Sequence, residues 1–386
     1  MTTTRTLISD DGHTAVYRVA VYGVVVGTDV VAYAPVDVPP PPPEAPAVSG
    51  GTVIVPEPNG VTDTAIIATA LASAVAAGKD LSFPPRRTYT LTPTANAQSL
   101  ISITASITVD LNGSTLKVGT NPYPKVNLIA ISGGARVTIR NGKIMGDRTT
   151  HDYATTAGTH EFGYGIYVAD ASVAVEDVEA SDFTGDAACI IGDSTCTARF
   201  TRLHAHHCRR QGISILAYGR VLVDDCHIHG IGTSDGIAGA APMAGIDVEP
   251  ASRTMTVDQV TVRDTRINCP IKSIVTSHTL TSLLVDGCTL TGQVLHTATG
   301  AGTFRDTSVT WPYVDQYAVP TMGTARASGC NIRSSRWQID GPMRDCTIAP
   351  LSDGWIPRLT IAATATLDAV TIDPGYTVTD QRTPPA

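Results

Sequence analysis

A six-residue pattern of apolar and polar positions recurs through most of this 386-residue chain. The unit is apolar at its first and last places and small or apolar at its fourth. Eleven copies run from "LNGSTL" at Leu111 to "LDAVTI" at Leu367, with a period of about 23 residues and with Asp, Asn or Gly in the turns. A short β-rich unit at this period predicts a solenoid of about ten coils, in which each coil packs on its neighbours.

A second strand pattern, Gly-Ile-x-Val, follows the six-residue unit in the middle coils. It appears as "GIYV" from Gly165, "CII" from Cys189, "GISI" from Gly212, "GIDV" from Gly245 and "SIV" from Ser273. The connection between the two patterns is long at about residues 146–164 and 230–244 and short in the coils between. At about 4.8 Å per coil, insertions three coils apart leave a gap of about 14 Å. We expect them to form the walls of a groove that is wide enough for a sugar chain.

The segment before the repeats carries the signals of one helix. Thr62 is placed to cap a helix that runs through about Ala77, and Gly78 is placed to end it. The order "NGVTDT", Ala-rich helix, "FPPRRTYTL" resembles the N-terminal segment of pectate-lyase-like proteins. The resemblance implies an all-β fold, a right-handed parallel β-helix whose N-terminal end is capped by this helix. The catalytic motifs of pectate lyases and polygalacturonases are absent from the sequence. The resemblance therefore implies a carbohydrate ligand but does not identify a reaction.

A run of five prolines, Pro39 to Pro43, divides the chain because it favours a stiff extended spacer. Residues 16–34 are apolar enough to suggest a membrane span, but Arg18 and Asp29 interrupt them, so we expect strands and no membrane span. The N-terminus lacks the pattern of a secretory signal peptide. The predicted domains are a small β-rich module (1–36), a Pro-rich linker (37–50), a capping segment (51–98) and the β-helix with the C-terminal region (99–386).

Composition narrows the class of partner. Only 16% of the residues are charged, against about 25% in an average protein. The net charge of −8 argues against a nucleic-acid partner. Eight cysteines show no metal-ligand spacing, and we expect no cofactor. Four of them occupy the apolar fourth place and should be reduced and buried, with the last two close enough to meet: Cys226, Cys288, Cys330 and Cys346.

The fifth place of the unit points outward and carries ionisable residues in five consecutive coils, from Lys143 to Arg266. In the other coils it is Thr, Ser or Asn. Two interpretations stay open, a groove that faces a ligand and a solvated face of stacked charges. Together with the short corners and the insertions, this column gives the predicted substrate-binding residues: Glu179, Asp186, His204, His206, His207, Arg209, Arg210, His227, Asp235 and Arg266.

Two carboxylates, Asp247 and Glu249, alternate with Ile246 and Val248 directly after the second insertion. If the two apolar residues face inward, both carboxyls point outward at a spacing that glycosidases use, and they are the candidate catalytic pair. Binding of sugar hydroxyls and a plain strand exterior are the alternatives. Elimination from a uronate is a further option, with Arg209 or Arg210 neutralising the uronate carboxylate.

The histidines of this region could also bind a metal. No carboxylate or Cys partner accompanies "HAHH", however, so we expect no metal there. The residues in question are His204, His206, His207 and His227. Near the C-terminus, four aromatic residues fit core packing, a subunit contact or a second sugar platform: Trp311, Tyr313, Tyr317 and Trp337.

Three functions compete. The order of a short module, a stiff spacer and a β-helix resembles the tailspikes and minor tail proteins of bacteriophages. That resemblance implies a virion protein, commonly a homotrimer, that acts outside the cell, contacts other phage tail proteins through its N-terminal module and binds host cell-surface polysaccharide. A free polysaccharide lyase or glycoside hydrolase is the first alternative. A purely structural tail fibre component, without a ligand, is the second.

Overall fold

The computed structural model describes residues 3–10, 14–21, 24–32, 51–232, 236–250, 255–298, 300–311, 321–352 and 355–382. The chain divides into two compact units, Met1–Pro39 and Pro40–Ala386. In the first unit, an antiparallel sheet consists of β1 (Thr3–Asp10), β2 (Thr14–Val21) and β3 (Val24–Ala32). The apolar stretch therefore forms strands, and the described part of the chain contains no helix long and apolar enough to cross a membrane. The proline run lies outside the described residues.

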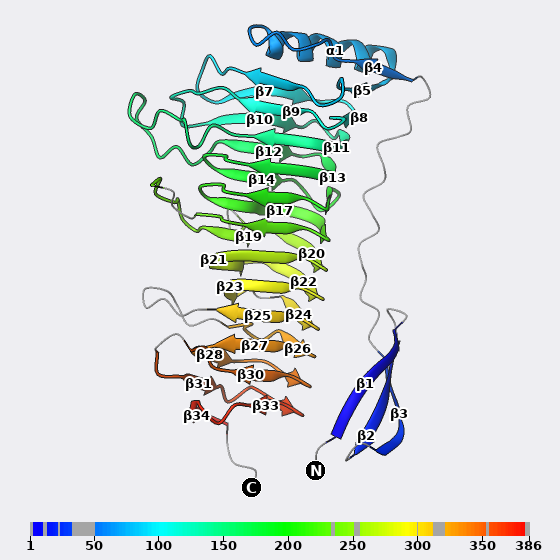
Figure 1. Cartoon of the computed structure of the whole chain (residues 1–386), viewed down its shortest axis with the longest axis vertical. Coiled ribbons are helices and arrows are strands. Elements are labelled where there is room, and N and C mark those ends of the chain that lie inside the picture. The colour runs from blue at the N-terminus through cyan, green and yellow to red at the C-terminus, as the bar shows by residue number, and fades with distance from the viewer. Residues whose placement is uncertain are drawn as a thin grey trace. The chain divides into compact units, whose positions relative to one another are not determined.

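The second unit is a parallel β-helix, in which 28 strands follow one another in a single hydrogen-bonded series (Figure 1). The strands stack into three faces. The site face consists of β7 (Gln98–Ile103), β10 (Val126–Ile131), β12 (Tyr164–Ala169), β14 (Asp186–Ile191), the first part of β17 (Gln211–Asp224), β19 (Ala244–Val248), and the second parts of β21 (Arg266–Thr276) and β23 (Thr289–His296).

The other two faces contain the six-residue units. The histidine face consists of β6 (Thr88–Leu91), β9 (Thr115–Val118), the second parts of β11 (Arg136–Met145) and β13 (Ser172–Ser181), β16 (His204–His206), β18 (His227–His229), the first parts of β21 and β23, β25 (Ser308–Trp311), β27 (Asn331–Ser334), β30 (Thr347–Ala349) and β33 (Thr371–Ile372).

The ion-pair face consists of β4 (Thr52–Ile54), β5 (Asp80–Ser82), β8 (Ile107–Asp110), the first parts of β11 and β13, β15 (Thr197–Thr201), the second part of β17, β20 (Val257–Arg263), β22 (Leu280–Asp286), β24 (Ala301–Arg305), β26 (Arg326–Ser328), β29 (Met343–Arg344) and β32 (Leu367–Asp368). A separate parallel sheet near the C-terminus contains β28 (Arg336–Ile339), β31 (Arg358–Ile361) and β34 (Thr377–Asp380).

The six-residue unit is confirmed as the repeat of the solenoid. Its fifth places pair in continuous parallel register from Thr115 to Thr371, through every predicted copy, and the stack begins one coil earlier, at Thr88. The third place of every copy has a left-handed backbone, with φ between 46° and 75°. Asp, Asn and Gly tolerate this conformation best, which explains why they recur there. An all-β parallel solenoid of the predicted length is therefore correct.

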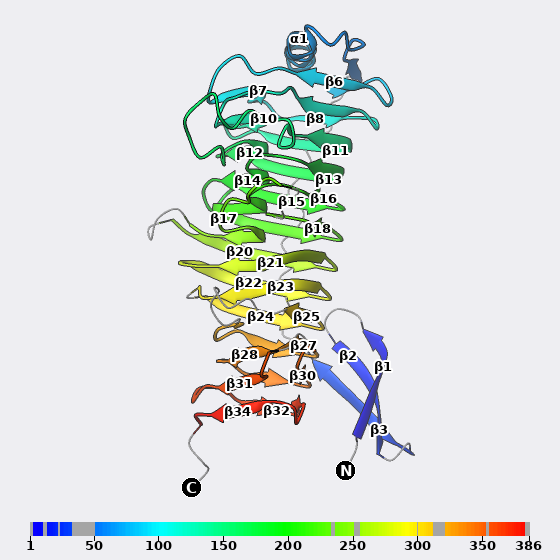
Figure 2. The same ribbon diagram turned by 60° about the vertical axis from the view of Figure 1, so that its left-hand side comes forward.

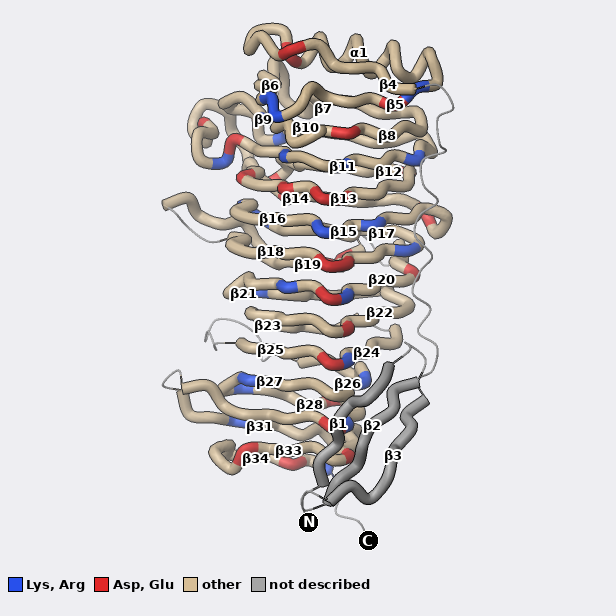
Figure 3. Tube along the Cα trace, turned by 45° about the vertical axis from the view of Figure 1, so that its right-hand side comes forward, with Lys and Arg blue, Asp and Glu red and all other residues tan. Residues whose placement is uncertain are grey.

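The ion-pair face owes its name to charges that alternate at the second place of the unit. Arg263 contacts Asp224 at 2.8 Å, and Arg305 contacts Asp286 in the next pair of coils. Figure 3 shows these blue and red positions following one another down the shaft. Both pairs are partly buried, with side chains between 11% and 37% exposed.

The N-terminal helix α1 (Asp63–Ala77) has its predicted bounds, and Gly78 ends it in the left-handed conformation with φ of 59°. The predicted cap was wrong in detail, because the Thr62 side chain makes no capping hydrogen bond. The buried carboxylate of Asp63 instead holds the loop before the helix: Oδ1 accepts the backbone N–H groups of Asn59 and Gly60, at 2.8 and 3.0 Å. Oδ2 accepts the N–H of Thr90 at 2.8 Å, which ties the helix to β6.

The interior is filled by the apolar places of the units. All eight cysteines are buried free thiols, as expected for the four at the fourth place. Cys330 and Cys346 contact each other on adjacent coils, as the sequence suggested. Trp311 and Trp337 are also buried, so core packing is correct for both. Tyr313 and Tyr317 lie outside the described residues.

Candidate functional site

The two insertions leave the shaft at the corner between the histidine face and the site face. The first connects β11 to β12, and the second connects β18 to β19 (Figure 1). They do not stand apart as the walls of an open groove, because Arg209 bridges them. Its guanidinium donates to the carbonyl oxygens of Thr159 and His160 in the first insertion and of Ala238 in the second, each at 2.9 Å. Arg209 therefore holds the two insertions together, and its predicted contact with a substrate stays a prediction.

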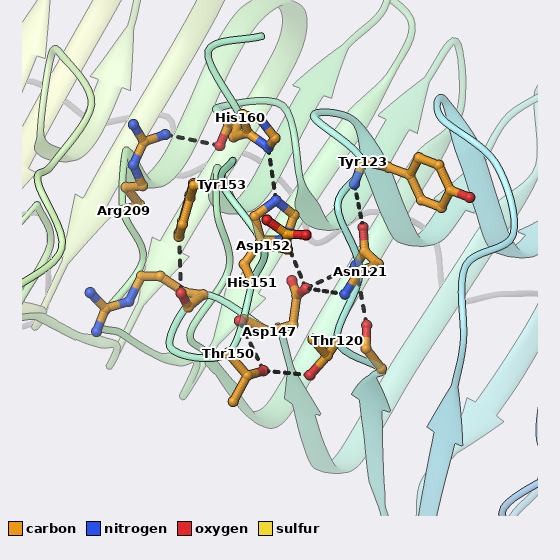
Figure 4. Close-up of polar contacts among 12 residues, drawn as sticks. Thr120, Asn121, Tyr123, Asp147, Thr150, His151, Asp152, Tyr153, His160 and Arg209 are labelled. Atoms are coloured by element: carbon orange, nitrogen blue, oxygen red, sulfur yellow. Dashed lines mark hydrogen bonds and ion pairs between the residues drawn. The ribbon is translucent and has the colours of Figure 1, made fainter. Parts of the chain in front are cut away.

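The first insertion is organised by a buried chain of polar side chains, shown in Figure 4. Asp147 Oδ2 lies 2.8 Å from His151 Nδ1, and His151 Nε2 lies 2.8 Å from His160 Nδ1. His160 Nε2 lies 2.8 Å from the carbonyl oxygen of Thr156, which can only accept. Both side-chain and backbone N–H groups of Asn121 also donate to Asp147 Oδ2, at 2.9 and 3.2 Å. Because the Thr156 carbonyl oxygen can only accept, His160 Nε2 donates in this bond.

Loss of the Arg209 guanidinium should loosen both insertions without unfolding the shaft. Arg209→Met keeps an aliphatic stem against Tyr153, over whose ring the guanidinium carbon lies at 5.4 Å, but removes the three hydrogen bonds. We expect a cost of about 1–3 kcal/mol in the free energy that closes the insertions. Faster amide exchange in residues 146–163 and 236–243 would reveal it. Arg199→Met, which breaks only a bond to Thr201, is the control and should leave those amides unchanged.

The site face has an outer surface formed by residue pairs three positions apart. The rings of Tyr164 and Tyr167 stack with centroids 5.7 Å apart and an interplanar angle of 15°, so both lie on the same side of β12. An intervening glycine permits this, because a Cβ at Gly165 would lie 2.6 Å from the Phe183 ring. On the following strands, the equivalent pairs are Asp186 and Cys189, Gln211 and Ser214, and Ala244 and Asp247, and all six residues are buried.

A continuous chain of hydrogen bonds joins two carboxyl groups across this surface. Arg210 Nη1 donates to Asp186 Oδ2 at 3.0 Å and to Gln211 Oε1 at 2.8 Å. Gln211 Nε2 donates to Asp247 Oδ2. Ser214 donates to Asp186 Oδ2 at 2.7 Å. Both carboxyl groups are buried, with side chains no more than 1% exposed, and Asp247 Oδ1 has no hydrogen-bond partner among the described residues.

Burial makes both carboxyls weaker acids than an ordinary aspartate. It raises the pKa of Asp186 to about 6, although the Arg210 cation opposes the rise. It raises the pKa of Asp247 to about 7, and the negative charge of Glu249 adds to the effect. A carboxyl with a pKa near neutrality can donate or accept a proton at physiological pH, and such groups cluster at functional sites. The sequence correctly predicted that the Asp247 side chain points away from the core. The expectation that both carboxylates are exposed to solvent was wrong, because Asp247 is buried and only Glu249 is exposed.

The predicted site residues therefore form two clusters on adjacent faces instead of one groove. Asp186, Arg210, Asp247 and Glu249 belong to the site face. The second cluster lies on the histidine face and at its corner: Glu179, His204, His206, His207, His227 and Arg266. Within it, Glu179 pairs with Lys143 at 2.8 Å. Asp235 lies outside the described residues.

The sequence did not single out Gln211, Ser214 and Tyr167, which complete the surface. Ser214 and Tyr167 occupy the same x position of the Gly-Ile-x-Val pattern as Asp247. Comparing the residues at the x position from coil to coil would have identified Ser214 and Tyr167. In the coil of β14 the pattern was misaligned by two residues, because Ala188, not Ile190, pairs with Ile213.

Comparison with known proteins agrees with the strand topology. The family described as "Right handed beta helix region" matches residues 127–309. The fold of this chain is a right-handed parallel β-helix. It is 30% identical over 213 residues to the uncharacterized protein YclG of Bacillus subtilis (strain 168), a match that covers 50% of this chain and 36% of that protein. It is 30% identical over 187 residues to the SPbeta prophage-derived uncharacterized protein YorA of the same strain, covering 43% and 31%. The chain thus spans about a third of each relative.

Among solved structures, similar folds occur in proteins of low identity. The catalytic domain of a GH87 alpha-1,3-glucanase is 12% identical, with a TM-score of 0.46 over 93% of this chain and 72% of that one. The Dettilon tailspike protein is also 12% identical, with a TM-score of 0.40 over 84% of this chain and 66% of that one. At this level the likeness concerns the fold alone.

Proposed function

We propose that this protein is a bacteriophage tail component whose β-helix binds host cell-surface polysaccharide on the site face. The observation that carries the proposal is the outer surface of β12, β14, β17 and β19, where stacked tyrosines adjoin buried carboxyls that titrate near neutrality. Aromatic rings pack against the C–H faces of sugars, and carboxylates accept sugar hydroxyls. The exposed rim of this surface is formed by Phe162, which is 41% exposed, and by Glu249.

Several features support the phage assignment. The 30% identical relative YorA bears the description prophage-derived. The chain begins with a separate three-stranded module, Met1–Pro39, ahead of the elongated β-helix unit. In our proposal residues 1–36 attach to other tail proteins, three chains associate, and the β-helix acts outside the cell. Sedimentation of the full chain at three times its own mass would support this organisation; a stable monomer would count against it.

Cleavage of the bound glycan is the second candidate function, favoured by the pKa of Asp247 near 7 and by its unpartnered oxygen. In this step the Asp247 carboxyl protonates the glycosidic oxygen as the bond to the anomeric carbon breaks. The Glu249 carboxylate takes a proton from the water that forms the new bond, leaving one new reducing end. Because Asp247 is enclosed, access would require displacement of the residues that cover it.

The two functions separate in one experiment. The full chain is incubated with a panel of bacterial cell-wall and capsular polysaccharides, and retention, reducing ends and absorbance near 235 nm are followed. Tyr167→Ala should weaken binding at least about tenfold, the worth of a lost aromatic contact. Trp355→Ala, at an aromatic residue near the C-terminus that is 39% exposed, should leave binding unchanged.

Asp247→Asn should abolish product formation while binding persists, whereas Asp258→Asn on the ion-pair face should keep both. If the unmodified protein binds a glycan but forms no product, the result supports binding alone, without cleavage. Absence of binding to every glycan, or equal loss in Trp355→Ala, would overturn the assignment of the site face.

A further inference from the structure

A second cluster, on the histidine face, takes no part in the proposed function. The sequences "HAH" and "HIH" lie on neighbouring strands β16 and β18, in register, with His204 beside His227 and His206 beside His229 (Figure 2). Ala205 and Ile228 between them are fully buried in the core. Strand alternation therefore places all four imidazoles on the outer side. Neighbouring ring centroids are 4.5 to 5.1 Å apart.

We propose that His204, His227 and His229 bind a divalent transition-metal ion, Zn²⁺ or a close neighbour in the first row. One ring nitrogen from each lies within 4.8 Å of the corresponding nitrogens of the other two. His204 Nε2 and His229 Nε2 are 2.8 Å apart. Tetrahedral Zn–N bonds of about 2.0–2.1 Å separate ligand nitrogens by about 3.3 Å, so small side-chain rotations bring the three to coordination distance.

The ligand chemistry suits a metal, because the neutral imidazole nitrogen is the commonest metal ligand in proteins. Three histidines with one open position form the ligand set of carbonic-anhydrase-type zinc sites, and imidazole nitrogen suits zinc, copper and nickel.

The fold itself does not require these histidines. In the coils that follow, the same outward column is Thr289, Ser308, Asn331, Thr347 and Thr371, and the strands pair equally well. His206 Nε2 is buried without a hydrogen-bond partner among the described residues; the nearest carboxylate oxygen, of Glu179, is 3.5 Å away. The neighbouring cations Lys143 and Arg266 oppose an added cation, while Glu179 favours it.

The test uses the full chain without a polyhistidine tag, stripped with chelator. Titration with ZnCl₂ by calorimetry should show one Zn²⁺ per chain, and Co²⁺ should give the visible absorption of a tetrahedral site. Because even second-shell partners contribute about 10- to 100-fold to affinity, His227→Gln and His229→Gln should each weaken binding at least about tenfold. His278→Gln, at a histidine that bonds Ser277 instead, should bind as the unmodified chain does.

A thermal readout keeps the proposal testable if a variant is destabilised. Zn²⁺ should raise the melting temperature of the unmodified protein and of His278→Gln, and should not raise that of His227→Gln or His229→Gln. No stoichiometric binding by the unmodified chain would overturn the proposal. Binding that survives both ligand substitutions would overturn it too, since the metal would then lie elsewhere.

Discussion

Asp247→Asn is expected to make this protein more stable than the unmodified chain at pH 8, with the difference disappearing near pH 4. The Asp247 carboxyl has a folded-state pKa of about 7 against an ordinary value of 3.8. The folded state therefore binds a proton more tightly than the unfolded chain does between about pH 4 and pH 7. Stability from this group is fully present below about pH 4 and is lost as the pH rises through about 7.

The size of this effect follows from the shift in pKa. A difference of about three units corresponds to an effect on the order of 4 kcal/mol in the free energy of unfolding at pH 8. Asn avoids the buried charge, and its amide oxygen still accepts the hydrogen bond from Gln211. Urea denaturation of both proteins at pH 4, 6 and 8 measures the difference directly. Asp186 and Glu249, which raise this pKa, and Arg210, which lowers it, are unchanged in both proteins.

Asp258→Asn provides the matched control, because it makes the same change on β20 of the ion-pair face, away from Asp247. Its own stability should change by less than about 1 kcal/mol. An Asp247→Asn protein that is no more stable than the original at pH 8 would contradict the raised pKa. A stabilised variant that also loses glycan cleavage would show that the buried acid is kept for function at the expense of stability.

His151→Leu should release the first insertion from the shaft. The substitution removes the imidazole between Asp147 and His160, leaving a buried carboxyl group and a ring nitrogen without their hydrogen-bond partner. A buried polar group left without its partner typically costs about 1–3 kcal/mol, and a charged one more. The loss should appear as local opening, measured by amide exchange at Arg148 and Asp152, whose N–H groups donate to the carbonyls of Asp182 and Asn121 at 2.8 and 3.1 Å.

Thr159→Ala, an exposed position in the same insertion, should leave that exchange unchanged, because its backbone carbonyl still accepts from Arg209. If His151→Leu exchanged no faster than this control, the Asp147–His151–His160 chain would have no part in holding the insertion.

The fold could be predicted from the sequence because the same six-residue pattern is repeated in every coil. The apolar first and sixth places, the small or apolar fourth place and the Asp, Asn or Gly turns were readable in most copies, and they set the register from Thr115 to Thr371. The N-terminal helix was readable for the same reason, from local turn chemistry. The role of Asp63 at the start of this helix was not, because the contacts of Asp63 include Thr90, which is 27 residues away.

The site was predictable only in part. Asp247 and Asp186 were identified as candidates from their positions, but their burial depends on contacts between coils, with Gln211 and Ser214. The role of Arg209 depends on carbonyl oxygens 29 to 50 residues away in two insertions, which no local pattern encodes. His229 was missed because "HIH" was read as one outward residue, His227, when strand alternation makes both histidines outward.

The coil-by-coil pairing also determines where the length of the β-helix can change without disturbing the site face. Because every coil bonds only to the coils on either side, a whole coil inserted beyond β23 would move the C-terminal end by about 4.8 Å and leave the site face intact. A coil inserted between β14 and β17 would instead separate Asp186 from Arg210 and Ser214. Length is therefore adjustable in whole steps along most of the shaft, and fixed only across the few coils from β12 to β19.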